Sequence, residues 1–210
     1  MWWIACSSSC LSLKMSERCA WAQGSEDYQR YHDEEWGRTL AGDRELFERL
    51  CLEGFQAGLS WITVLRKREA LRTALVDFDV EELADFTQDR ISYAMSLPNV
   101  IKHRGKFTAV VGNARVLLEA WEREGEGWLS ATFAAAAPTE ASLRAQGFRR
   151  PPRVGSELPS QTLETQALAK DLKALGFRFV GPTTLYAAMQ ATGYVSDHLV
   201  GCPLRPISPI

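Results

Sequence analysis

The stretch that decides the fold of this chain is CLEGFQAGLSW, at residues 51–61. It follows a run at residues 43–51 whose apolar side chains recur at the spacing of one helix face. Within the stretch a single carboxylate, Glu53, stands among apolar residues and two glycines. Ser60 is a suitable N-cap for a second helix that begins with Trp61. The pattern predicts a helix–turn–helix corner, with the turn beginning after Cys51.

Two interpretations of this corner are open. In the first, Glu53 and Trp61 form the wall of a pocket, because glycine lets the backbone turn sharply or come close to a ligand. In the second, the corner is a tight interhelical turn, with Glu53 in solvent and Trp61 in the core. The stretch alone does not separate the two, because short motifs often match by chance.

Length and composition are those of a soluble globular protein. The 210 residues suit one large domain, and the 46% of apolar and 24% of charged residues are ordinary. No apolar run approaches the roughly 18 residues of a membrane span, so we expect no membrane partner. The net charge of −2 does not indicate a nucleic-acid binder, and any such site would be a local basic patch.

The first residues, MWWIACSSSCLSLK, have no basic region ahead of their apolar residues and make a poor signal peptide. Met15 follows at once. We expect residues 1–14 to be a disordered extension or a start-site artefact, and residues 15–210 to form a single domain. Without the extension three cysteines remain: Cys19, Cys51 and Cys202. Because this count is odd and no secretory signal is seen, we expect the protein in the reducing cytoplasm.

Helical periodicity runs through the rest of the chain, and no segment shows convincing β-alternation. The clearest helix is predicted at residues 107–123, which carry a strongly amphipathic pattern. Other helices are predicted at residues 60–78, after the Asp79 cap, from Thr87, and at residues 162–175. A last helix is predicted to be capped by Thr183 or Thr184, and the Pro-rich residues 139–159 to form a long loop. The predicted fold class is all-α.

Two histidine–cysteine pairs lie near the two ends of the chain: Cys19 with His32, and His198 with Cys202. Together they have the Cys₂His₂ composition of a structural zinc site, although not the spacing of a zinc finger. A shared ion would fasten the N-terminal segment to the C-terminal one. The alternative is that the cysteines are unrelated small residues and the histidines are solvated.

A further feature of the chain is the basic sequence LPNVIKHRGK at residues 97–106. Its LPNV resembles the turn of a helix-hairpin-helix, in which backbone N–H groups at a helix N-terminus hold a DNA phosphate. The side chains that follow make the turn locally basic: Lys102, His103, Arg104 and Lys106. The alternative is an ordinary turn between two helices with a charged face.

Taken together, these segments resemble the DNA-3-methyladenine glycosylase I family, a branch of the helix-hairpin-helix glycosylases. The resemblance runs from Met15 to Cys202, and two regions depart from it: the leader, and residues 144–159, which look longer than the family pattern. The matching segments are RCAW (18–21), YHDEEWG (31–37), CLEGFQAGLSWITVL (51–65), IKHRGKFTAVVGNA (101–114), GFRFVG (176–181) and DHLVGC (197–202).

The resemblance implies a role for each matching residue. Glu53 matches the catalytic-site carboxylate that hydrogen-bonds the excised base, and Trp61 matches the aromatic residue that stacks on it. Leu59 matches a residue presented to the gap left by the flipped nucleotide. The remaining pocket residues are Trp21, Tyr31 and Trp36. The hairpin residues expected to contact DNA are Val100, Lys102, His103, Arg104, Gly105 and Lys106. The implied zinc ligands are Cys19, His32, His198 and Cys202.

The chemistry of an alkylated base agrees with these residues. While attached to its sugar, 3-methyladenine is a cation and a good leaving group, which suits aromatic stacking and one carboxylate. No lysine nucleophile and no clean aspartate candidate follow the hairpin, since residues 118–120 are Leu-Glu-Ala. We therefore expect a monomeric, monofunctional glycosylase that acts on double-stranded alkylated DNA. Two alternatives are a catalytically inactive module that binds alkylated DNA, and a zinc-stabilised helical domain that binds a small purine.

Overall fold

The computed structural model describes residues 18–40 and 42–206, so the predicted extension at residues 1–14 lies outside it. Across these residues the chain forms ten α-helices and three short 3₁₀ helices and no strand, which confirms the all-α prediction. No helix in the described ranges has the length and apolar content needed to cross a bilayer.

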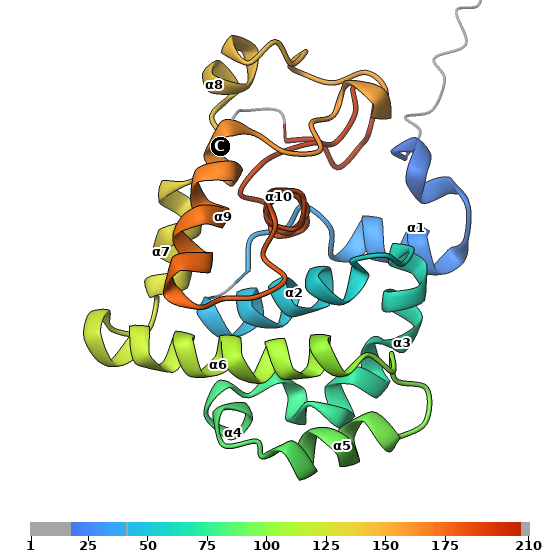
Figure 1. Ribbon diagram of the computed structural model, residues 1–210. Coiled ribbons are helices and arrows are strands. Elements are labelled where there is room, and N and C mark those ends of the chain that lie inside the picture. Colours follow the sequence, from blue (N-terminus) through green and yellow to red (C-terminus); the bar gives the residue numbers. More distant parts are fainter. Residues whose placement is uncertain (1–17, 41, 207–210) are drawn as a thin grey trace, which may run out of the picture.

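The helices follow one another along the chain, with the longest connection between α8 and α9 (Figure 1). In chain order they are η1 (Ala20–Gln23), α1 (Glu26–Glu34), α2 (Asp43–Gln56), α3 (Trp61–Ala74), η2 (Val76–Phe78), α4 (Val80–Ala84), α5 (Gln88–Ser96), α6 (Arg104–Glu124), α7 (Trp128–Ala135), α8 (Glu140–Ala145), η3 (Gly155–Glu157), α9 (Leu163–Leu175) and α10 (Pro182–Ala191).

Helix α2 runs through the middle of the molecule, with α6 on one side of it and α10 on the other (Figure 1). Ten of its fourteen residues are buried, because α3 and α7 cover its remaining sides. A helix that is enclosed in this way is expected to be apolar nearly all round. The few polar side chains on its inner turns, Arg49 and Glu53, are therefore unusual and need a separate explanation.

The two ends of α2 are held by charged side chains. At the first residue, the Asp43 carboxylate accepts hydrogen bonds from the Trp121 indole at 2.7 Å and from the Leu129 and Ser130 amides at 2.9 and 2.7 Å. These bonds join the start of α2 to the end of α6 and the start of α7. At the last turn, the ammonium of Lys106 donates to free carbonyl groups of α2, which fixes this end as well.

The predicted turn after Cys51 is wrong, because α2 continues through Glu53 to Gln56. Gly54 lies inside the helix at a close approach: a Cβ there would stand 3.3 Å from the Cβ of Phe179. The turn comes later, at Gly58, whose positive φ of 77° suits glycine. Ser60 is the N-cap and Trp61 the first residue of α3, as predicted, but the Ser60 hydroxyl bonds the Thr63 hydroxyl rather than a backbone amide.

Three other predicted boundaries also differ from the structure. Helix α3 ends at Ala74, because residues 76–78 have positive φ angles. The predicted loop at residues 139–159 contains α8, whose N-cap Thr139 accepts from the Ser142 amide. The last helix begins at Pro182 rather than after Thr183 or Thr184, since proline is favoured at the first helical position.

Candidate active site

A cavity of about 280 Å³ opens between η1, α1, the end of α2 and the start of α3. Its size lies at the small end of the range for small-molecule sites. Aromatic rings dominate the lining, with one carboxyl group among them. The lining residues are Trp21, Tyr28, Tyr31, Trp36, Glu53, Gln56, Trp61, Leu158, Ala187 and Gln190.

The rings pack against one another at oblique angles. The Tyr31 and Trp61 rings have centroids 5.3 Å apart, and the Trp21 and Trp36 rings 5.1 Å apart. The hydroxyl of Tyr28 accepts from the Ile62 amide at 3.1 Å, which ties α1 to one of the unpaired N–H groups at the start of α3. The cavity therefore has aromatic walls that three separate segments hold in place.

Glu53 reaches this cavity from the last turns of α2 and is only 6% exposed. No hydrogen bond from any described residue reaches its carboxyl group. Burial raises the pKa of Glu53 to about 8, and the nearby Arg49 opposes that shift only in part. A buried polar group without a partner costs free energy, so its presence beside an aromatic cavity indicates a ligand. Of the two interpretations of the corner, the structure supports the pocket wall and excludes a solvated Glu53.

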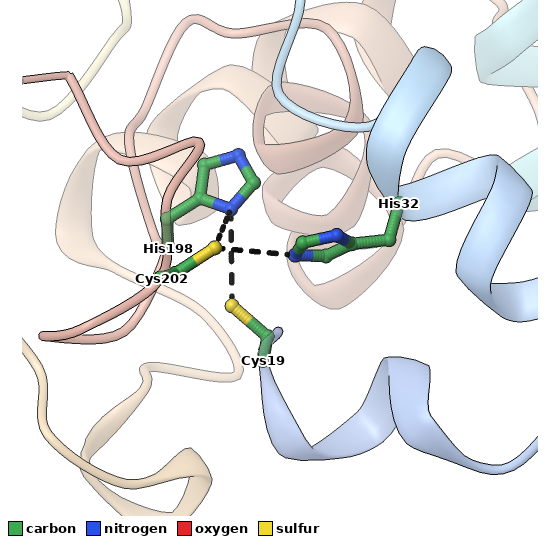
Figure 2. A group of neighbouring side chains, drawn as sticks. All are labelled: Cys19, His32, His198 and Cys202. Atoms are coloured by element: carbon green, nitrogen blue, oxygen red, sulfur yellow. Dashed lines mark hydrogen bonds between the residues drawn. The ribbon is translucent and has the colours of Figure 1, made fainter. Parts of the chain in front are cut away.

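The four predicted metal ligands meet at one point, although they come from opposite ends of the chain (Figure 2). All four are buried, and their ligand atoms lie within 4.8 Å of one another. The Cys202 sulfur is 3.5 Å from His32 Nε2 and 3.4 Å from His198 Nδ1, and the Cys19 sulfur is 3.8 Å from His198 Nδ1. Tetrahedral zinc with sulfur and nitrogen ligands requires separations of about 3.3–3.8 Å, so the donor set fits this ion.

The groups around the cluster orient its ligands. His32 Nδ1 lies 2.8 Å from the Asp33 carboxylate, which leaves Nε2 facing the sulfur atoms. The Leu199 amide donates to the Cys19 sulfur at 3.3 Å. A Cβ at Gly37 would stand 2.8 Å from His198 Nε2, so only glycine fits there.

The cluster and the cavity share a wall. The Trp36 ring lies 4.7 Å from the His198 ring and stacks on the His32 ring at 6.1 Å. The Trp21 ring lies 5.4 Å from the His32 ring. Two of the cavity's tryptophans are therefore positioned by the same side chains that would hold a metal ion.

The predicted hairpin is the connection between α5 and α6. Asn99 has a left-handed φ of 62°, Val100 is buried, and residues 102–105 are exposed. His103 caps α6, because its Nδ1 accepts from the Lys106 amide at 3.2 Å. The amides of Arg104 and Gly105, in the first turn of α6, have no acceptor among the described residues. This surface presents free N–H groups at a helix N-terminus.

Lys106 does not belong to that surface, contrary to our expectation for the hairpin. It is 5% exposed, and its ammonium donates to the Phe55 and Ala57 carbonyl oxygens at 2.7 and 2.5 Å. Burial lowers the pKa of this group. The periodicity of α6 could not reveal this, since it requires knowing that the end of α2 packs against Lys106. Leu59, by contrast, is 40% exposed in the turn just beyond.

Several cavity residues were not predicted from the sequence. Tyr28 could have been chosen, because it lies one helical turn before Tyr31 on the same face of α1. Leu158, Ala187 and Gln190 come from distant segments and carry no local signal of a binding site. Arg49, which contacts Tyr31 from α2, reads in the sequence as an ordinary helix surface residue.

The buried Glu53 predicts a pH-dependent effect of Glu53→Gln on stability. The folded protein keeps the Glu53 proton up to about pH 8, whereas the unfolded chain loses it near the ordinary pKa of 4.5. The parent's free energy of unfolding therefore falls as pH rises between those values, and the glutamine variant lacks this loss. From pH 5 to pH 8 the free energy of unfolding of the variant, relative to that of the parent, should rise by on the order of 3 kcal/mol.

Denaturant unfolding at both pH values measures this difference. Glu119→Gln, at an exposed glutamate of α6, is the matched control and should show no such gain. A stability difference between Glu53→Gln and the parent that does not vary with pH would contradict the burial argument.

Comparison with known proteins agrees with the geometry. The methyladenine glycosylase family matches residues 21–205. A DNA-3-methyladenine glycosylase 1 from Escherichia coli is 40% identical over 190 residues, which cover 90% of this chain and 97% of the relative.

Two solved structures are also similar. A crystal structure of 3-methyladenine DNA glycosylase I has a TM-score of 0.79 and 39% identity, with 90% of this chain and 100% of that chain covered. A Staphylococcus aureus structure that describes 3-methyladenine recognition has a TM-score of 0.80 and 32% identity, with 92% and 99% covered. The chain therefore belongs to the methyladenine glycosylase family.

Proposed function

We propose that this chain is a DNA-3-methyladenine glycosylase, which takes 3-methyladenine from double-stranded alkylated DNA into the aromatic cavity and hydrolyses its N-glycosidic bond. The observation that carries the proposal is the buried carboxyl of Glu53, which has no hydrogen-bond partner in the described part of the chain and lies among the aromatic rings of the cavity. The Escherichia coli relative is named for this activity, and the Staphylococcus aureus relative for recognition of this base.

Recognition begins with extrusion of the damaged nucleotide, which costs a few kcal/mol and least for a damaged base. The alkylated base is a cation while it is attached to the sugar. The faces of Trp61 and Tyr31 then attract it by about 0.5–2 kcal/mol through the cation–π interaction. The Glu53 carboxylate accepts from the exocyclic amine, and the positive base favours the ionised form that burial opposes.

Cleavage needs little acid catalysis, because the base leaves as a neutral molecule. The bond between the sugar C1′ and the base nitrogen breaks, and its electron pair goes to the base. Water supplies the hydroxyl at C1′ and releases its other proton to the solvent. Among the described residues no lysine lines the cavity, so none is placed to form a covalent adduct with the sugar. This supports a monofunctional hydrolase that leaves the DNA strand intact.

Mutation of the cavity tests this function directly. Purified protein should release free 3-methyladenine from methylated DNA. Glu53→Gln should lower release by roughly ten- to a thousandfold, about 1.4–4 kcal/mol, because it loses a charge-assisted hydrogen bond but the leaving group stays activated. Trp61→Ala should weaken binding of the free base by roughly 1–3 kcal/mol. Parent-level release by Glu53→Gln would place the active site elsewhere.

We assign DNA contact to the hairpin and to the turn before α3. The free amides of Arg104 and Gly105 are suited to one phosphate, and the exposed Lys102 adds positive charge beside them. The exposed Leu59 is apolar and is suited to fill the gap left by the flipped nucleotide. In this arrangement Val100 is buried beneath the hairpin and His103 caps α6.

The hairpin assignment predicts a change in salt dependence. Lys102→Ala should reduce the slope of log K against log salt by about 0.7–0.9, because one fewer counterion is released on binding. Lys170→Ala, at an exposed lysine of α9, is the matched control and should leave the slope unchanged, because α9 packs on α10 away from the hairpin. Equal slopes for Lys102→Ala and the parent would remove the hairpin from the interface.

We also propose one structural Zn²⁺ on Cys19, His32, His198 and Cys202. Four protein ligands fill a tetrahedral site and leave no position for a reactive water, so the ion would fasten the two ends of the chain rather than act in catalysis. We further propose a monomer that works in the cytoplasm, where the free cysteine thiols stay reduced.

Elemental analysis checks the metal assignment. Purified protein should contain about one zinc per chain, and Cys202→Ser should lower both the zinc content and the thermal stability, because a structural ion contributes to folding. Cys51→Ser, at a buried cysteine outside the cluster, is the control and should keep the zinc. A parent protein with less than a tenth of the expected zinc would contradict the assignment.

A further inference from the structure

Arg49 lies on α2 one helical turn before Glu53, which places both side chains on one side of the helix. Its guanidinium is almost fully buried, with 8% of the residue exposed. One nitrogen, Nη1, donates to the Tyr31 hydroxyl at 3.0 Å, and the other, Nη2, donates to the Glu35 carboxylate at 3.3 Å. A buried arginine is therefore bonded directly to a hydroxyl of the aromatic cavity.

The hydrogen bond between Arg49 and Tyr31 can have only one direction. A guanidinium has five N–H donors and no acceptor, so the tyrosine oxygen must accept. The hydroxyl proton is then left for another partner. No described residue accepts it, and Tyr31 lines the cavity together with Glu53. The hydroxyl proton is therefore available to a group that enters the cavity.

The positive charge of Arg49 is balanced away from the cavity. Glu35 accepts from Arg49 and also from both terminal nitrogens of Arg68, at 2.5 and 3.0 Å. The Glu35 carboxylate thus offsets the positive charge of Arg49. A cationic base can therefore enter the cavity, although a buried arginine lies next to Tyr31.

We propose that Arg49 is a positioning residue for base recognition: it holds the Tyr31 hydroxyl as a hydrogen-bond donor toward the cavity, beside the acceptor that Glu53 supplies. This inference rests on the proposed glycosylase function. One donor beside one acceptor matches the edge of an adenine, which presents ring nitrogen N7 as acceptor and the N6 amine as donor. A guanine presents two acceptors, N7 and O6, at the same edge, and fits the pair less well.

A double-mutant cycle separates this role from a merely structural one. The dissociation constant for free 3-methyladenine and the excision rate on methylated DNA are measured for the parent, Arg49→Met, Tyr31→Phe and the double variant. Arg49→Met should weaken base binding by about tenfold, the upper range for one neutral hydrogen bond. The double variant should bind no more weakly than Tyr31→Phe, because Arg49 acts only through the hydroxyl.

Arg49→Gln and Arg49→Lys complete the design. Both retain an N–H donor, and glutamine removes the charge, so each should bind the base within about threefold of the parent if hydrogen-bond direction is what matters. If Arg49→Met does not fold, Tyr31→Phe and the double variant still decide the question, because removing both partners leaves no unpaired polar group.

Three results would overturn the inference while leaving the function intact, provided that the parent excises 3-methyladenine. The first is that Arg49→Met binds the base as tightly as the parent. The second is that the affinity losses of the two single variants multiply in the double variant. The third is that Arg49→Gln loses as much affinity as Arg49→Met. A folded parent that neither binds nor excises the base would instead refute the proposed function and, with it, the role of Arg49.

Discussion

A carboxyl group buried without a hydrogen-bond partner is the constraint on which the rest of this structure depends. Glu53 occupies that position on α2, the most enclosed helix of the fold. The cost is offset by packing along α2 and by charged groups at both of its ends, Asp43 and Lys106. The scaffold thus holds a destabilising group in one place, as expected for a site prepared for a ligand.

The Cys/His cluster packs against one wall of the same site, which Trp21 and Trp36 form. Its residues come from the first and last described segments, yet their ligand atoms lie within 4.8 Å of one another. Because Trp21 and Trp36 contact the two histidine rings, fastening the chain ends also sets the shape of the cavity. A single cluster therefore links the contact between the first and last described segments to the geometry of the aromatic cavity.

Local patterns in the sequence were sufficient to predict the helices and the types of residue at the site. The all-α class, the cap at Asp79 and the meeting of the four metal ligands agree with the sequence predictions. The failures have a common cause: they depend on contacts between distant segments. Glu53 was assigned to a turn because its two glycines suggest one, whereas Gly54 serves a close contact with Phe179 inside α2.

Lys106 was assigned to DNA for a related reason. In the sequence it belongs to a basic run, and only the fold shows that its ammonium faces the carbonyl groups at the end of α2. Gln190 and Arg49 show the reverse error, since neither stands out in the sequence. Gln190 lines the cavity, and Arg49 donates to the hydroxyl of Tyr31, which lines it too. Charge and periodicity predict which face a side chain occupies, but not which partner it finds there.

The most direct test of the central claim is the ionisation of Glu53 itself. Carbon-13 NMR of the labelled glutamate carboxyl can follow its titration in the free protein and with 3-methyladenine bound. The account predicts a pKa of about 8 in the empty cavity and a clearly lower value with the base present, because the amine donates to the carboxylate. A pKa near the ordinary 4.5 in the free protein, unchanged by the base, would contradict the claim.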